Sequence, residues 1–228
     1  AVKNNIFGTE ILARASLENN AGKFIFISTD KAVNPISVMG QTKRIGEMLC
    51  MALNQRGLTK FISVRFGNVL GSRGSVIPLF KEQIAKGGPV EVTHEEMKRY
   101  FMIIPEAVGL VLQAGQMGKG GEVFVLNMGD SVRIVDLARD VIKLSGLEPD
   151  KDVPIVFTDP KPGEKMFEEI LTAEEGTTAT SDEKIYTANL SCIEESKLAE
   201  NLNKLAELVN GSNGEEIKNQ LNLIIKNN

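Results

Sequence analysis

The sequence predicts an α/β protein with a parallel, doubly wound sheet. Short apolar runs that suit buried strands, such as residues 24–27 and 61–66, alternate with segments whose apolar residues recur at helical spacing. Strands that alternate with helices along the chain are typical of βαβ units, whose parallel strands are buried on both faces. With 228 residues, 42% of them hydrophobic, the chain is long enough for one or two domains with an ample core.

The same patterns place each element along the chain. We expect, in order, helix 2–19, strand 23–28, helix 39–56, strand 60–66, helix 77–86, strand 90–93, helix 105–117, strand 122–127, helix 132–145, strand 153–157 and helix 163–172. Pro105 suits the first turn of its helix, and Ser131 precedes the apolar positions of the next helix as an N-cap does.

The last part of the chain is predicted to be a loop followed by two helices. Residues 172–184 are rich in Thr, Glu and Ser and favour a loop. From Ser191, leucines and isoleucines recur at helical spacing in two segments, which the turn-forming run 210–214 separates. We expect these helices to close a substrate-binding region or to pack on a partner.

Composition and charge exclude several classes of protein. A net charge of −4 and a pI near 5.3 argue against nucleic acid as a main partner. Cys50 and Cys192 lie far apart, which indicates a reducing compartment without disulfides, and the single histidine, His94, excludes a histidine-rich metal site. No apolar run reaches the roughly 18 residues of a membrane span, so we expect a cytoplasmic segment without membrane contact.

A polar motif follows the first predicted strand. It consists of Ser28, Thr29, Asp30 and Lys31. Open α/β sheets bind ligands at the carboxyl ends of their strands, which is where this motif falls. In the following helix, Met39 and Lys43 are four residues apart and share one face. An acid, an amine and hydroxyls that face a second amine can together move protons and a hydride.

Each of these residues also has a purely structural interpretation. Ser28 is as suited to capping a turn as to binding a ligand. Met39 is of a type that usually fills a core, and Lys43 could lie on a solvated face. The coincidence of several such residues at one spacing favours the functional interpretation.

A glycine-rich segment follows the second predicted strand. Residues 67–75 contain three glycines beside Asn68 and Arg73. Such a segment allows the backbone to approach a ligand closely, although composition alone favours a mobile loop.

Together these motifs resemble the extended short-chain dehydrogenase/reductases, and most closely their polysaccharide-biosynthesis (CapD-like) UDP-N-acetylglucosamine 4,6-dehydratase branch. That family has a serine or threonine at the strand end, then Asp-Lys, then a Tyr-x-x-x-Lys helix. Here Met39 takes the tyrosine position, as in a subgroup of the family, and Lys43 is kept. The resemblance extends from about residue 1 to residue 189.

The resemblance implies a substrate-binding set further along the chain. By it, Asn68 and Arg73 contact the nucleotide sugar, and Arg99 neutralises its diphosphate. Residues 161–165, Lys-Pro-Gly-Glu-Lys, resemble the family's Arg-Pro-Gly-Glu-Lys and add Lys161 and Glu164. Lysine in the first position keeps the charge but loses the bidentate geometry of arginine.

The resemblance also implies an activity, the internal redox dehydration of a UDP-sugar to a 4-keto-6-deoxy sugar with NAD or NADP. Asp30 would be the acid that helps the C6 hydroxyl leave, and Lys31 the base at C5. Thr29 or Ser28 would bond the sugar 4-hydroxyl, and Ser28 and Lys43 would contact the cofactor. Because Met39 carries no titratable proton, the proton of the 4-hydroxyl must leave by another route.

The chain has no Gly-x-Gly-x-x-Gly turn of the kind that opens dinucleotide-binding folds. We therefore expect a C-terminal piece of a longer protein, with a truncated reading frame as the alternative. Residues 1–75 would be the second half of the Rossmann-like domain, 76–190 the substrate-binding region and 191–228 C-terminal helices. We expect the complete protein to be a homo-oligomer, and it is a candidate for anchoring at the inner face of the membrane.

Two other functions stay open. A nucleotide-sugar 4-epimerase or reductase would share the scaffold, but such enzymes normally keep the tyrosine and lack the Asp-Lys pair. A non-catalytic nucleotide-sugar-binding or assembly module would explain why the cofactor-binding half is missing.

Overall fold

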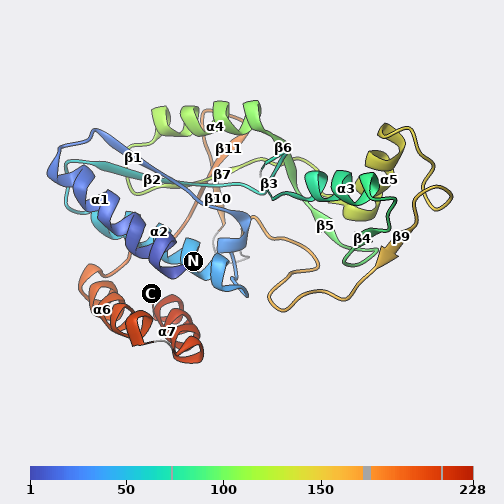
Figure 1. Ribbon diagram of the computed structural model, residues 1–228. Coiled ribbons are helices and arrows are strands. Elements are labelled where there is room, and N and C mark those ends of the chain that lie inside the picture. Colours follow the sequence, from blue (N-terminus) through green and yellow to red (C-terminus); the bar gives the residue numbers. More distant parts are fainter. Residues whose placement is uncertain (73, 172–175, 212, 228) are drawn as a thin grey trace. The chain divides into compact units, whose positions relative to one another are not determined.

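The main sheet of the protein is mixed and has five strands in the order β1-β2-β7-β11-β10 (Figure 1). The computed structural model describes residues 1–228 except 73, 172–175, 212 and 228. The strands are β1 (Lys23–Ile27), β2 (Lys60–Arg65), β7 (Val123–Leu126), β11 (Ile185–Ala188) and β10 (Thr177–Ala179). Strands β1, β2 and β7 are parallel, whereas β11 and β10 are antiparallel to their neighbours. The predicted α/β class is confirmed.

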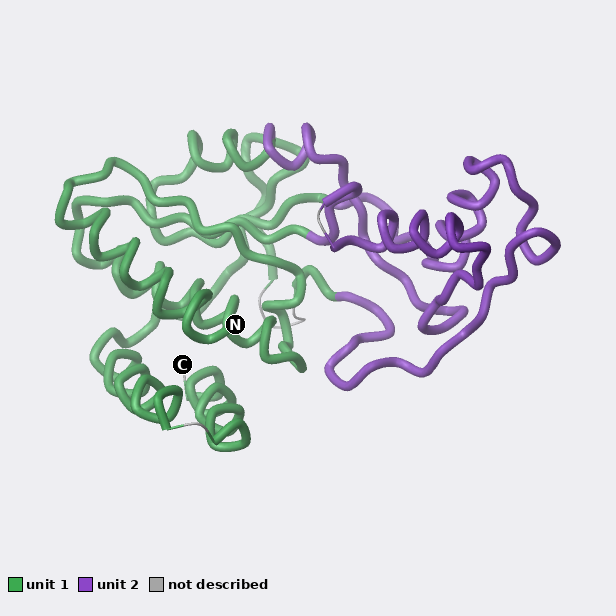
Figure 2. Tube along the Cα trace, in the orientation of Figure 1, with its two compact units in different colours: residues 1–66, 110–127, 169–228 green, residues 67–109, 128–168 purple. Residues whose placement is uncertain are grey.

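The chain folds into two compact units, each assembled from separate stretches of sequence (Figure 2). Unit 1 comprises residues 1–66, 110–127 and 169–228, and unit 2 comprises residues 67–109 and 128–168. Helix α4 (Ile104–Met117) begins in unit 2 and ends in unit 1.

Helices cover both faces of the sheet in unit 1 (Figure 1). A π-helical turn (Lys3–Phe7), α1 (Gly8–Glu18) and α2 (Val38–Asn54) lie on one side, and the second half of α4 lies on the other. Helix α2 begins at Ser37, whose side chain accepts a hydrogen bond from the Gly40 N–H. Gly46 lies directly over the Phe26 ring, so α2 packs close to β1. This packing places the first turns of α2 beside the end of β1.

The two C-terminal helices, α6 (Glu195–Gly211) and α7 (Gly214–Lys226), pack on α2 and the π-helical turn. Leucines of α6 and α7 meet Ile45, Met48 and Leu49 of α2 in one buried cluster. The predicted helices are therefore present, but they cover the helix beside the main sheet. Their apolar stripes match the outer apolar face of α2, and closure of a substrate-binding region by these helices stays a prediction.

Besides the start of α4, the described residues of unit 2 form three two-stranded sheets and two helices. These are β3 (Asn68–Leu70) with β6 (Phe101–Ile103), β4 (Val90–Val92) with β9 (Ile155–Phe157), β5 (Lys98–Arg99) with β8 (Val132–Arg133), and helices α3 (Val76–Ala85) and α5 (Ile134–Leu144). Helices α3 and α5 pack together over a core that includes Phe80, Val90 and Ile142. Backbone bonds tie β5 to α5 and to the segment around Met166, since Met97 accepts from Ile134 and Met166 accepts from Lys98.

The helix expected over 163–172 is wrong. Residues 163–171 form turns and bends, and residue 172 lies outside the described chain. Gly163 adopts a positive φ of 84° inside a turn that the Glu164 N–H closes on the Lys161 carbonyl, and the Met166 carbonyl accepts from the Lys98 N–H of β5 instead of a helical partner. The loop expected over 172–184 is also wrong in part, because β10 falls within it. Its three residues are exposed and carry no apolar signal, so pairing with β11 defines the strand.

Within the described residues, no helix is both long and apolar enough to cross a membrane.

Candidate active site

The end of β1 turns into a short 3-10 helix (Asp30–Ala32) that begins the candidate site. Backbone bonds continue along β2 past the strand end: the Ser28 N–H donates to Val64 O at 2.8 Å, and the Asp30 N–H donates to Phe66 O at 3.1 Å. Thr29 caps the 3-10 turn by accepting from the Lys31 N–H. Hydrogen bonds to Val64 and Phe66, and one within the turn, therefore hold the backbone of the polar motif in place.

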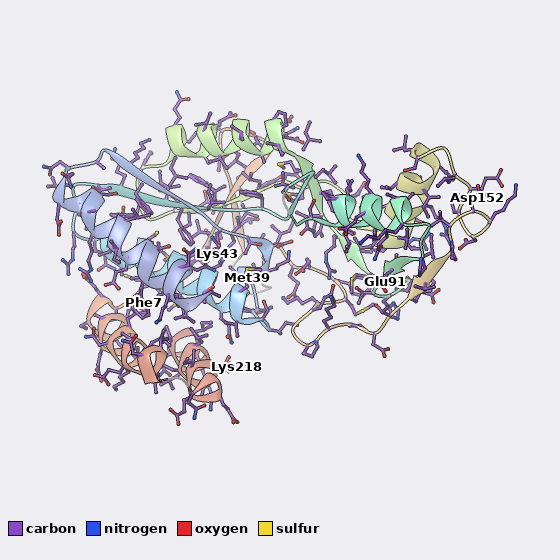
Figure 3. All side chains as sticks on the ribbon, viewed as in Figure 1. Phe7, Met39, Lys43, Glu91, Asp152 and Lys218 are labelled. Atoms are coloured by element: carbon purple, nitrogen blue, oxygen red, sulfur yellow. The ribbon has the colours of Figure 1, made fainter. Side chains whose placement is uncertain are left out.

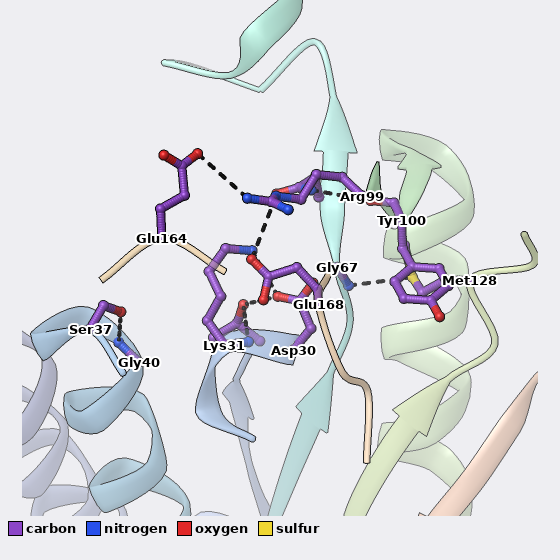
Figure 4. Close-up of polar contacts among 12 residues, drawn as sticks. Asp30, Lys31, Ser37, Gly40, Gly67, Arg99, Tyr100, Met128, Glu164 and Glu168 are labelled. Atoms are coloured by element: carbon purple, nitrogen blue, oxygen red, sulfur yellow. Dashed lines mark hydrogen bonds and ion pairs between the residues drawn. The ribbon is translucent and has the colours of Figure 1, made fainter. Parts of the chain in front are cut away.

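Asp30 is the centre of the polar contacts at this strand end. Its side chain is fully buried, and its Oδ1 accepts from Thr29 Oγ1 and from Lys31 Nζ, each at 2.8 Å (Figure 4). The Lys31 side chain is 27% exposed and reaches the surface, whereas the Asp30 side chain does not. Asp30 Oδ2 is buried and has no hydrogen-bond partner among the described residues. A carboxylate that contacts a hydroxyl and an amine can pass protons between them.

Helix α2 presents Met39 and Lys43 one turn apart (Figure 3). Met39 is 39% exposed, whereas Lys43 Nζ donates to Ile27 O at 3.0 Å and lies 4.9 Å from the centre of the Phe26 ring. Burial lowers the pKa of the Lys43 amine, against the opposing effect of the Glu47 carboxylate. Lys43 is thus bonded to the last residue of β1 and lies beside the polar motif.

The close approach of α2 to the strand end depends on a glycine. A Cβ atom at Gly40 would overlap the carbonyl oxygen of Lys31 and press on Pro35. Only a residue without a side chain lets the first turn of α2 come this near to the Asp30-Lys31 backbone.

Ser28 does not face open space; it is buried and donates to Glu47 Oε1 at 2.6 Å. Arg65 forms two further bonds with the same carboxylate, from Nε to Oε1 and from a terminal nitrogen to Oε2, both at 2.7 Å. Arg44 adds a bond to Oε2 at 3.1 Å. Burial alone would raise the pKa of Glu47, but Arg65 holds it below its usual value. The predicted cofactor contact of Ser28 is untested by this arrangement.

Sequence reasoning missed Glu47 and Arg65. A signal was present, because Arg65 ends an otherwise apolar strand and Glu47 stands among the buried residues of α2. Charged residues in buried elements are almost always paired. The partner could not be assigned from sequence, since the two lie 18 residues apart on different elements.

In unit 2, Arg99 of β5 meets two carboxylates. The guanidinium donates to the carbonyls of Lys98 at 2.8 Å and Met166 at 3.2 Å, and lies 3.5 Å from Glu164 Oε1 and 3.6 Å from Glu168 Oε1 (Figure 4). The structure therefore brings the predicted Arg99 and Glu164 together. It adds Glu168, which no motif in the sequence singles out.

The other predicted substrate-binding residues also belong to unit 2. The side-chain amide of Asn68 donates to the Tyr100 carbonyl at 3.3 Å, which fixes it between β3 and β6. Lys161 is exposed, and its N–H donates to Glu164 Oε2 at 3.3 Å. Arg73 lies outside the described residues.

A Rossmann-like sheet with an Asp-Lys strand end and a helix lysine defines a protein of the short-chain dehydrogenase/reductase class, as predicted. Residues 1–190 match the model of the family described as polysaccharide biosynthesis protein, and the chain belongs to that family. The matched region ends just before α6 and α7.

Named relatives agree with this family. The chain is 58% identical over 187 residues to the capsular polysaccharide biosynthesis protein CapD of Staphylococcus aureus, covering 82% of this chain and 31% of CapD. It is 59% identical over 175 residues to the probable polysaccharide biosynthesis protein EpsC of Bacillus subtilis, covering 77% and 29%. A UDP-glucose 4-epimerase of Rickettsia bellii is 40% identical over 178 residues, covering 77% and 51%. The chain thus spans about a third of CapD and EpsC.

Solved structures share the fold. Pen from Bacillus thuringiensis superposes with a TM-score of 0.76 at 35% identity, over 88% of this chain and 67% of that one. The dTDP-glucose 4,6-dehydratase of Bacillus anthracis, determined in complex with NAD, gives a TM-score of 0.65 at 19% identity, over 76% and 60%. The second likeness concerns the fold alone.

Proposed function

We propose that this chain is the catalytic part of a longer, NAD(P)-dependent nucleotide-sugar 4,6-dehydratase that converts UDP-N-acetylglucosamine to a 4-keto-6-deoxy sugar for polysaccharide synthesis. The observation that carries the proposal is the contact of the buried Asp30 carboxylate with both the Thr29 hydroxyl and the Lys31 amine. A 4,6-dehydration moves protons at O4, C5 and O6, and here a hydroxyl relay and an amine each lie 2.8 Å from the same acid, Asp30 Oδ1.

The chain fits part of a nicotinamide site. A lysine ammonium carries three donors, so Lys43 can bond a ribose hydroxyl in addition to the Ile27 carbonyl. Its positive charge beside the strand end would favour hydride acceptance. The missing glycine turn means that the pyrophosphate must be held by residues outside this sequence. When bound, the nicotinamide would take the C4 hydride and later return it to C6.

The Thr29–Asp30 contact offers a route for the 4-hydroxyl proton that tyrosine carries elsewhere in the class. Met39 cannot accept it, because a thioether has no titratable proton. A 4-hydroxyl that donates to Thr29 Oγ1 can lose its proton there while Thr29 passes its own proton to Asp30 Oδ1, 2.8 Å away. Asp30 ends this step as a neutral acid.

Protonated Asp30 can then give its proton to the departing C6 hydroxyl, which leaves as water. One proton leaves O4 and one enters the water, so the two steps balance through one carboxyl group. Lys31 would act as the base at C5 in its neutral amine form. The neutral amine would take the C5 proton and give it back after the hydride returns.

The substrate's diphosphate would be bound by Arg99 of unit 2, with Asn68, Arg73, Lys161 and Glu164 as further contacts of the nucleotide sugar. The planar fork of arginine suits two phosphate oxygens. Because the chain spans about a third of its relatives CapD and EpsC, the reaction is expected only in the complete protein. Titration of NAD or NADP into the 228-residue chain alone should show no micromolar binding.

Three substitutions in the complete protein test the chemistry. Asp30→Asn removes the acid and Lys31→Met removes the amine, and each should lower the rate about 10²–10⁴-fold, the usual value for a positioned acid or base. Met39→Ala should cost far less, because methionine can only shape the site. Keto-sugar formation and deuterium uptake at C5 are the measurements. The Met39→Ala protein must still fold and bind substrate for this comparison. If it then lost as much activity as Asp30→Asn, the assignment of the proton transfers to Asp30 and Lys31 would be wrong.

A nucleotide-sugar 4-epimerase is the second candidate, favoured by the likeness to the Rickettsia bellii enzyme. An epimerase returns the hydride to C4 and releases no water, so it needs no acid at O6. Product analysis separates the two functions: a C4 epimer without a keto sugar would replace the dehydratase proposal.

A further inference from the structure

A buried ionic cluster lies behind the candidate catalytic strand end. We call Ser28, Arg44, Glu47 and Arg65 the Glu47 cluster. Glu47 and Arg65 are both fully buried and share two bonds of 2.7 Å, while the Ser28 hydroxyl donates to the same carboxylate at 2.6 Å. The cluster therefore joins three elements: the end of β1, helix α2 and the end of β2.

Packing alone does not explain a fully buried ion pair at this place. Removing two charges from water is costly, and hydrophobic residues of similar volume often give equal or greater stability. Hydrophobic residues cannot supply directional bonds that set the orientation of neighbouring side chains. A bidentate carboxylate–guanidinium pair with an added hydroxyl fixes three side chains in one geometry.

Ser28, Glu47 and Arg65 are each linked to the candidate site through the backbone. Ser28 directly precedes Thr29, and Glu47 is one helical turn beyond Lys43 on α2. Arg65 directly precedes Phe66, whose carbonyl accepts from the Asp30 N–H at 3.1 Å. A shift of the cluster would thus move Thr29, Asp30 and Lys43 together.

We infer that Glu47 and Arg65 are positioning residues for the reaction and that Ser28 acts through Glu47 instead of touching the cofactor. This inference rests on the proposed function for its catalytic consequence, and on the contacts above for its geometry. It refines the expectation that Ser28 is a cofactor ligand. The negative charge of Glu47 also acts on Lys43, where it opposes the lowering of the amine pKa by burial.

Ser28→Ala is the decisive variant, because it removes one hydroxyl and leaves the Glu47–Arg65 pair in place. Ser28→Thr keeps the hydroxyl, and Glu47→Gln removes the central charge. Glu195→Gln is the matched control, since it changes the same residue type in a solvent-exposed pair with Arg56 in the same unit. All are made in the complete protein.

We expect Ser28→Ala to lower kcat about tenfold, the order of one lost buried hydrogen bond, with unchanged KM and unchanged NAD(P) affinity. Hydrogen exchange of the peptide covering residues 28–33 should become faster, because the Asp30, Ala32 and Val33 amides bond within this turn or to β2. Ser28→Thr should restore both values toward wild type, Glu47→Gln should show a larger effect of the same kind, and Glu195→Gln should match wild type.

Two results would overturn the inference. Weakened NAD(P) binding with normal exchange at 28–33 in Ser28→Ala would make Ser28 a direct cofactor ligand. Unchanged kcat and exchange would make the cluster structural only. A wild-type protein that forms no keto sugar would refute the proposed function, and the exchange measurement would still decide whether the cluster fixes the strand end. If Glu47→Gln does not fold, the Ser28 variants decide the question.

Discussion

Arg65 and Arg99 both meet glutamates, and they do so in opposite ways. Arg65 in unit 1 is fully buried and shares two bonds of 2.7 Å with Glu47. Arg99 in unit 2 keeps 9% of its side chain exposed and lies 3.5 Å and 3.6 Å from Glu164 and Glu168. The shorter bonds of Arg99 go to backbone carbonyls.

The difference indicates that arginine–glutamate pairs have two roles in this protein, one structural and one in ligand binding. Short, fully buried bidentate bonds leave no room for another anion, so the Arg65–Glu47 pair belongs to the architecture. The bonds to the Lys98 and Met166 carbonyls hold the Arg99 guanidinium in place, while its two carboxylate partners lie beyond ideal hydrogen-bonding distance. Such a group is suited to exchange a carboxylate for a diphosphate, which is the role that we propose for it.

Loss of Arg65 should have the largest effect. Arg65→Met leaves the Glu47 charge buried without its main partner, which should lower the free energy of unfolding by about 3–5 kcal/mol. Urea denaturation measures this. Adding Glu47→Gln to Arg65→Met should recover part of the loss, because it removes the orphaned charge. If Arg65→Met lowered the free energy of unfolding no more than Arg99→Met does, the two arginines would not differ in their contribution to stability.

Loss of Arg99 should act on ligand binding instead of folding. In the complete protein, Arg99→Ala should weaken UDP-sugar binding by about 1.5–3 kcal/mol, the range for a lost charge-assisted bond. Calorimetric titration of the UDP-sugar is the measurement. Arg139→Ala is a control in the same unit, because Arg139 pairs with Asp136 on the surface of α5. Unchanged affinity in Arg99→Ala would mean that the diphosphate binds elsewhere.

The Glu47 cluster also predicts a pH dependence of stability. The folded-state pKa of Glu47 lies below its ordinary value of 4.5, so its contribution is complete above pH 4.5 and is lost as the pH falls toward the lower folded-state pKa. Each unit of depression is worth about 1.4 kcal/mol. Unfolding free energies measured below pH 4.5 should fall less steeply in Glu47→Gln than in wild type. Equal slopes would contradict the prediction.

The smallest effect is expected for a short but exposed pair. Lys86 and Glu82 of α3 are 2.6 Å apart, closer than Arg65 and Glu47, yet both are well exposed. Solvent screens such a pair, so Lys86→Met should leave the urea midpoint unchanged within error. A loss comparable to that of Arg65→Met would show that distance, and not burial, separates these pairs.

Much of the fold was predictable because its signal is local. The apolar runs of β1, β2 and β7 and the periodicity of α2, α5, α6 and α7 follow from neighbouring residues. Strand β10 and the irregular segment after Gly163 were not, because pairing with β11 and with β5 decides them. Such long-range bonds override weak local preferences.

In the candidate site too, contacts between neighbouring residues could be predicted, and contacts between distant residues could not. Thr29, Asp30 and Lys31 are consecutive, so their mutual contacts could be expected from the sequence, although their catalytic roles stay predictions. The pairing of Glu47 with Arg65, and of Arg99 with Glu168, joins elements distant in the chain. A sequence shows that a buried charge needs a partner but not which residue it is.

The glycine that follows Met39 has a consequence for the way this site tolerates change. At position 39 the side chain is 39% exposed, so we expect replacement of methionine by tyrosine or leucine to be tolerated. At position 40 any side chain would collide with the Lys31 carbonyl. In a saturation library, variation should therefore be broad at 39 and nearly absent at 40. A new functional group can therefore be introduced at position 39 only while position 40 stays glycine.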